Sequence, residues 1–169
     1  MAAKKFIRLV GGVLTEIFGT QTSAGAANAG DIPALNDSGV FDITLMPAGV
    51  GAQTKIVLAS EAIASGNWVN VYNNAGTANV RKADATVAGK EANGFVLAAI
   101  SSGSTGTVYL SGTNNQVTSQ TPGKVFLSTT PGAGAAAAPS AAGNVVQELG
   151  YAVSATEVAF APKSTVTLA

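Results

Sequence analysis

The sequence lacks the two side chains that carry out much of protein chemistry, because it contains no His and no Cys. The chain therefore has no imidazole base and no thiol nucleophile. A two-carboxylate mechanism, as in glycoside hydrolysis, needs only acidic residues, and Asp31, Asp37 and Asp42 are close in sequence. Asp31 and Asp37 occupy turn-forming positions, however, where a short carboxylate commonly accepts hydrogen bonds from backbone N–H groups. We predict a non-enzymatic protein without a cofactor.

The same region offers oxygen atoms to a metal, since Asp31, Asn36 and Asp37 resemble calcium ligands in type. Their spacing is not that of an EF-hand loop, and no Glu closes the loop. The glycines at Gly11-Gly12 and at 103–106 have neither the Walker lysine pattern nor a G-x-G-x-x-G that opens a helix. We expect turns at these positions, with no bound metal and no phosphate site.

Aromatic residues are few, and two of them, Trp68 and Tyr72, fall on one predicted strand. Trp68, Asn70 and Tyr72 alternate with valines and therefore share a face of that strand. Packing in the core or at a subunit interface is favoured, because the chain has few other large side chains. The alternative is a binding module that stacks a sugar on Trp68, Tyr72 or Tyr109.

Charge is sparse and balanced along the 169 residues, with nine basic and nine acidic side chains. They make up 11% of the chain, against roughly 25% in typical soluble domains, so we expect a surface that is partly covered. No basic patch is present, which argues against a nucleic-acid partner. Residues 92–123 carry no charge but are too polar to span a bilayer. Arg8 and Glu16 interrupt the apolar start, so neither a secretion signal nor a membrane partner is expected.

The first 50 residues are expected to form an anchoring region. Two apolar runs, Phe6–Val10 and Val13–Phe18, flank Gly11-Gly12 and predict a tight β-hairpin. Residues 19–30 are small and polar, which predicts a flexible or extended connector. Residues 31–47 predict an extended arm with one turn at residues 36–39.

Residues 51–169 contain short β-type runs separated by turn residues, which predict an all-β fold, an antiparallel β-sandwich or barrel. The similar runs 108–111 and 125–128 are expected to be neighbouring strands, with Tyr109 and Phe126 on one face. Residues 130–140 are expected to form a surface loop. The expected strands cover residues 55–58, 68–72, 79–81, 94–100, 107–110, 124–127, 144–147, 149–153 and 157–160.

Residues 30–51 (GDIPALNDSGVFDITLMPAGVG) resemble the G-x-I-x-A-L-(D/N)-x-x-G-x-(I/F)-D-x-x-x-M-P segment of tailed-bacteriophage fibre and head-decoration proteins. Residues 92–98, 106–113, 121–128 and 143–153 look similar to them too. The resemblance implies a structural virion protein, made in the host cytoplasm, that binds the major capsid protein on the outside of the shell as a decoration (cement) protein or short head fibre. It also implies a homo-oligomer, a trimer. The alternative is a fibre or adhesin module for a host glycan, which the lack of shaft repeats disfavours.

The candidate contact residues for the capsid or a neighbouring subunit are the larger side chains of residues 1–50, together with one Arg. They are Phe6, Ile7, Arg8, Leu9, Leu14, Ile17, Phe18, Ile32, Leu35, Phe41 and Met46.

Overall fold

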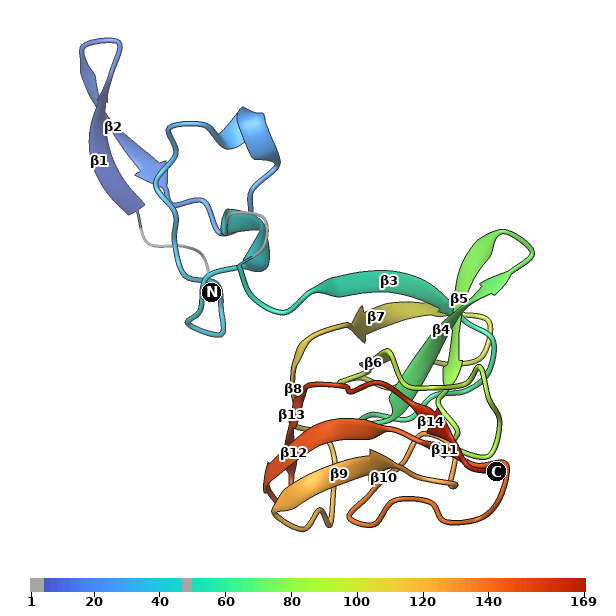
Figure 1. Ribbon diagram of the computed structural model, residues 1–169. Coiled ribbons are helices and arrows are strands. Elements are labelled where there is room, and N and C mark those ends of the chain that lie inside the picture. The colour runs from blue at the N-terminus through green and yellow to red at the C-terminus, as the bar shows by residue number, and fades with distance from the viewer. Residues whose placement is uncertain (1–4, 47–49) are drawn as a thin grey trace. The chain divides into compact units, whose positions relative to one another are not determined.

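The computed structural model describes residues 5–46 and 50–169 and shows an all-β chain with a β-hairpin near its N-terminus, which confirms the predicted fold class (Figure 1). The chain divides into two compact units, Met1–Gly51 and Ala52–Ala169. The strands are β1 (Lys5–Val10), β2 (Val13–Phe18), β3 (Thr54–Ala59), β4 (Trp68–Asn74), β5 (Thr77–Lys82), β6 (Gly94–Phe95), β7 (Thr105–Tyr109), β8 (Gly112–Asn114), β9 (Gly123–Leu127), β10 (Gly134–Ala135), β11 (Val145–Val146), β12 (Glu148–Ser154), β13 (Glu157–Phe160) and β14 (Val166–Thr167).

The N-terminal hairpin is built as the sequence predicts. Strands β1 and β2 pair antiparallel, and their register ends with Val10 opposite Val13. Gly11 and Gly12 join them with φ angles of 57° and 86°. A two-residue turn with positive φ at both positions suits glycine and matches the twist of the flanking strands. The Gly-Gly turn therefore fixes which side chains face each other.

The segment between the hairpin and residue 46 is more ordered in its hydrogen bonding than the predicted connector and extended arm. It contains two 3-10 helices, η1 (Gly25–Asn28) and η2 (Ile43–Leu45). Thr20 exchanges two backbone hydrogen bonds of 2.9 Å with Ile32 and Ala34. Short polar side chains bond to nearby backbone and replace strand pairing as the source of local structure. The turn at residues 36–39 is present, and Pro47 lies outside the described residues.

Residues 52–169 combine a barrel with a second sheet (Figure 1). The barrel closes in the order β3-β5-β4-β6-β7, and the second sheet runs β10-β9-β12-β13-β8. All these pairs are antiparallel except β3 with β5, which are parallel over two residue pairs. Strands β11 and β14 form a separate antiparallel pair.

Two hydrophobic cores fill this unit, and successive residues along the barrel strands contribute to different cores. Val69, Val96 and Val108 belong to the core of barrel residues. Their neighbours Trp68 and Phe95 pack instead with residues of the second sheet. This alternation follows from the two-residue period of a strand, so the barrel wall separates the two cores.

Three aromatic rings join the barrel to the second sheet. Trp68 of β4 lies 5.7 Å from Phe95 of β6 and 5.3 Å from Phe160 of β13, measured between ring centroids. Phe95 and Phe160 are 5.7 Å apart in an edge-to-face arrangement. Tyr109 stacks on Phe95 at 5.4 Å. Aromatic rings at these separations attract each other beyond their burial of apolar area.

Three expectations about this unit were wrong, at least in part. The similar runs 108–111 and 125–128 are not neighbouring strands, because β7 lies in the barrel and β9 in the second sheet. The run 94–100 forms a strand over only two residues, β6. Its later residues Val96 and Ile100 are apolar because they fill the barrel core, not because they pair along a sheet. Residues 134–135 of the predicted loop form strand β10.

Amide side chains replace missing strand pairing at several places. The Gln147 side chain accepts from the Ala92 N–H and donates to the Ala92 C=O, both at 2.8 Å. Asn93 forms the same double contact with the backbone of Val71, at 2.7 and 3.0 Å. Asn114 donates to the Gly66 C=O at 2.9 Å. These contacts satisfy backbone groups that the short strands leave unpaired.

Gln147→Met should destabilise the protein by about 2–5 kcal/mol, because it keeps the side chain's length but leaves two buried backbone groups of Ala92 without partners. Urea unfolding measures the change. The matched control Gln53→Met, at an exposed site, should change the free energy of unfolding by less than about 0.5 kcal/mol. Equal stabilities for both variants would contradict this role of Gln147.

A chain that begins at Ala52 should fold cooperatively without residues 1–51. Every buried hydrophobic residue of the described chain lies between Val57 and Phe160, so the deletion removes nothing from either core. Near-ultraviolet circular dichroism of the Trp68 environment and thermal unfolding test this. Loss of the aromatic signal or of a cooperative transition in the shortened chain would show that residues 1–51 are needed for folding.

Candidate functional site

The N-terminal unit exposes its apolar side chains instead of burying them. None of its described residues is buried, and Leu14 and Ile7 are 74% and 70% exposed. Of the twenty large hydrophobic residues exposed in the described chain, thirteen lie in this unit. Large exposed apolar surfaces mark interaction sites in soluble proteins when their residues form a patch. These residues are the strongest candidate for a functional surface.

The β1–β2 hairpin is apolar on both faces near its turn. Leu9 pairs with Leu14, and Val10 pairs with Val13. Because paired residues share a face and successive residues alternate, the two pairs lie on opposite faces. Polar contacts gather at the other end, where Lys5 forms a 2.6 Å ion pair with Glu16. The hairpin therefore ends in an apolar tip formed by residues 9–14.

The structure exposes nine of the eleven predicted contact residues. Phe6 and Ile17 are half-buried, and they face each other across the hairpin. The exposed predicted residues are Ile7, Arg8, Leu9, Leu14, Phe18, Ile32, Leu35, Phe41 and Met46.

Five further exposed apolar residues were missed by the sequence reasoning. They are Val10, Val13, Val40, Ile43 and Val50. The Gly-Gly turn could have identified Val10 and Val13, because a two-residue turn places these residues opposite each other beside it. No comparable pattern marks the other three, which lie outside the strands of the described chain.

The acidic residues of this unit are engaged in local hydrogen bonds. The Asp31 carboxylate accepts from Asn28 Nδ2 and Thr20 Oγ1, each at 2.9 Å. These bonds, first that from Asn28, lower the pKa of Asp31 below its ordinary value. Hydrogen bonds from Thr44 lower the pKa of Asp42 in the same way. Both carboxyl groups are therefore ionised at neutral pH, and neither suits the proton-donor role of a two-carboxylate hydrolase.

The described residues contain no group of three or more acidic side chains placed to hold a metal ion. In the region considered for calcium, the Asp31 carboxylate is engaged by Thr20 and Asn28.

The three aromatic residues considered for sugar stacking do not form a common platform. Trp68 is 1% exposed and lies in the core. Tyr109 stacks on Phe95, and the Arg81 guanidinium lies 4.3 Å from the centre of the Tyr72 ring. Tyr151, which the sequence reasoning passed over, is 46% exposed.

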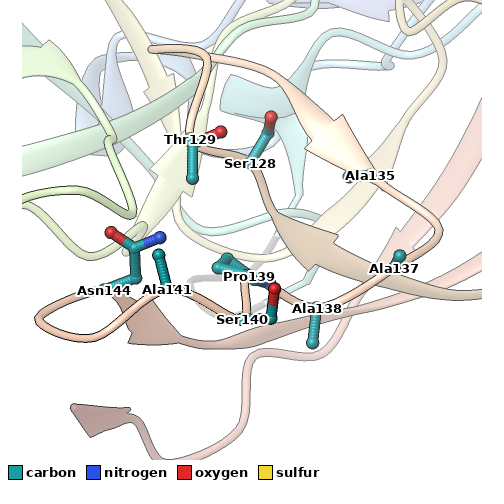
Figure 2. A pocket seen from close by; sticks show the side chains of 9 residues that line it. All are labelled: Ser128, Thr129, Ala135, Ala137, Ala138, Pro139, Ser140, Ala141 and Asn144. Atoms are coloured by element: carbon teal, nitrogen blue, oxygen red, sulfur yellow. The ribbon is translucent and has the colours of Figure 1, made fainter. Parts of the chain in front are cut away.

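A hollow of about 340 Å³ lies between residues 128–129, strand β10 and the loop at 137–144 (Figure 2). Alanines line much of it, together with Pro139 and the polar side chains Ser128, Thr129, Ser140 and Asn144 (Figure 2). No charged or aromatic side chain lines the hollow. It therefore lacks groups that orient a ligand strongly, and we assign no chemistry to it.

Comparison of the chain with family models, curated proteins and solved structures found no match. Among the residues that the structure describes, no helix has the length and apolar character needed to cross a membrane. The exposed apolar side chains of the N-terminal unit therefore remain the main indication of function.

Asn28→Ala should raise the pKa of Asp31 toward its ordinary value, because it removes the largest contribution to the lowered pKa. A carboxyl group with a lowered pKa stabilises the fold above its unfolded-state pKa, and this stabilisation is lost as pH falls through the folded-state pKa. The variant should therefore lose this contribution at higher pH than the parent. A carbon-13 titration of the aspartate carboxyls measures this, with Asp42 as the internal control; an unmoved Asp31 midpoint would contradict it.

Proposed function

We propose that this chain is a structural virion protein that binds the outside of a phage capsid and stabilises it, with the major capsid protein as its partner. The observation that carries the proposal is the apolar surface of residues 5–46 and 50–51, which exposes thirteen large hydrophobic side chains and buries none. The resemblance of residues 30–51 to phage head-decoration proteins supplies the identity of the partner.

The energetics favour a unit that is completed by its partner. A two-stranded hairpin is marginally stable alone in water, whereas burial of one large apolar side chain contributes about 1.5–3 kcal/mol. Burying even a few of the exposed side chains on a shell would stabilise both the hairpin and the complex. Among the described residues, β1 and β2 form a sheet of two strands, so their outer edges are also suited to strand addition to a neighbouring protein.

The stabilising effect on the shell follows from binding itself. A protein that binds only the assembled shell lowers the free energy of that state. The effect grows as the concentration of the protein rises above its dissociation constant. A trimer whose three N-terminal units contact adjacent shell subunits would add avidity, because the second and third contacts form at high effective concentration. No reaction is needed for this role.

Leu14→Asp should abolish binding to shells assembled from the major capsid protein encoded in the same genome. Leu14 is 74% exposed at the hairpin tip, so a charge there costs the free chain little but would be buried without a partner in the complex. The loss should exceed about 100-fold in affinity, since an unpaired buried charge costs about 3–5 kcal/mol. Co-sedimentation with shells measures it.

Val153→Asp is the matched control, because Val153 is 62% exposed on strand β12 of the other unit. It should bind shells as the parent does. Full shell occupancy by the Leu14→Asp chain, or equal losses in both variants, would contradict docking through the hairpin.

A further inference from the structure

A second hollow, of about 210 Å³, lies above the buried edge of Trp68 in the C-terminal unit. Ser65, Gln116 and Thr118 form part of its rim and are exposed to solvent. Every side chain that lines it is uncharged. At about 30 Å³ per molecule, it has room for roughly seven waters, which is enough for a small polar ligand.

Trp68 exposes very little of its side chain at this hollow. Its ring packs against Phe95 and Phe160, and the residue is 1% exposed. Among the described residues, no acceptor forms a hydrogen bond with the Trp68 indole N–H. Every side-chain nitrogen of these residues that is fully buried does have a hydrogen-bond partner, so the indole nitrogen is not fully buried. The indole nitrogen therefore retains access to the hollow. A tryptophan N–H in a site shielded on its other sides normally finds an acceptor.

Gly134 lies close to this donor and also lines the hollow. A Cβ atom at Gly134 would lie 2.8 Å from Val125 Cγ1, 3.0 Å from Trp68 Nε1 and 3.5 Å from Gln120 Oε1, so both polar atoms are near this glycine. The amide nitrogen of Gln120 donates to the Thr118 C=O at 3.0 Å, so its oxygen is the end that remains for a ligand. One donor and one acceptor thus lie near the same glycine at the hollow.

We propose that this hollow binds a neutral, hydroxyl-rich ligand, namely a sugar of monosaccharide size. A hydroxyl group both accepts and donates, so one sugar hydroxyl can accept from the Trp68 indole and donate to Gln120. The uncharged lining disfavours phosphates, carboxylates and amines, which would be desolvated without a counter-charge. This site contacts the sugar through the edge of Trp68, not through the stacking face considered as an alternative from the sequence, and it is independent of the proposed capsid docking by the N-terminal unit.

The test is a titration of the nitrogen-15-labelled full-length chain with glucose, galactose, mannose and N-acetylglucosamine. Trp68 is the only tryptophan in the sequence, so a single indole N–H signal reports on the hollow. At least one sugar should shift this signal to saturation. Gln120→Ala should weaken that binding about 2- to 10-fold, as expected for the loss of one hydrogen bond.

The matched control is Gln53→Ala, an exposed glutamine outside the hollow, which should bind as the parent does. The proposal is overturned if no sugar moves the indole signal, if Gln120→Ala binds as well as the parent, or if glycerol shifts the signal with the same affinity as the sugars. The last result would indicate unselective hydroxyl binding.

Discussion

The contact among Trp68, Phe95 and Phe160 determines how residues 52–169 are organised. These rings come from β4, β6 and β13, and they bring the barrel and the second sheet onto one core. The remaining members of that core are mostly Ala, Val and Leu. In a chain with 6% aromatic residues, these three side chains supply a large share of the apolar area that holds the two sheets together.

Because both cores are complete within residues 52–169, the apolar residues of the first unit are left for another role. Their side chains enter neither core. Local order in that unit comes from the Gly-Gly turn and from short polar side chains such as Asn28 and Asp31. Polar contacts therefore contribute to the local structure of the unit, while thirteen of its large apolar side chains remain exposed.

The sequence predicted those parts of the fold that depend on local patterns. The hairpin was predictable because two glycines between apolar runs specify both the turn and the register. Most long strands were predictable from their β-branched runs. Strands β8 and β10 were not, because Gly112–Asn114 and Gly134–Ala135 lack large side chains and form strands only through their partners β13 and β9. The pairing of β7 and β9 with different sheets likewise depends on tertiary packing.

The candidate sites differ in the same way. The exposed hairpin residues follow from composition, since a short unit with many apolar residues cannot bury them all. The hollow at Trp68 was not predictable, because it depends on which edge of the ring is open and on Gly134, which is 66 positions away in the sequence (134 minus 68). The favoured interpretation of Trp68, packing in the core, agrees with the structure, whereas the alternative of sugar stacking needs a ring face that Phe95 and Phe160 cover.

Hydrogen–deuterium exchange of the full-length chain, free and bound to capsid shells, tests the central claim most directly. The account predicts rapid exchange of the β1–β2 amides in the free chain and strong protection on shells, with little change in the barrel strands. Protection confined to residues 52–169, with an unchanged hairpin, would contradict the assignment of the N-terminal unit as the anchor.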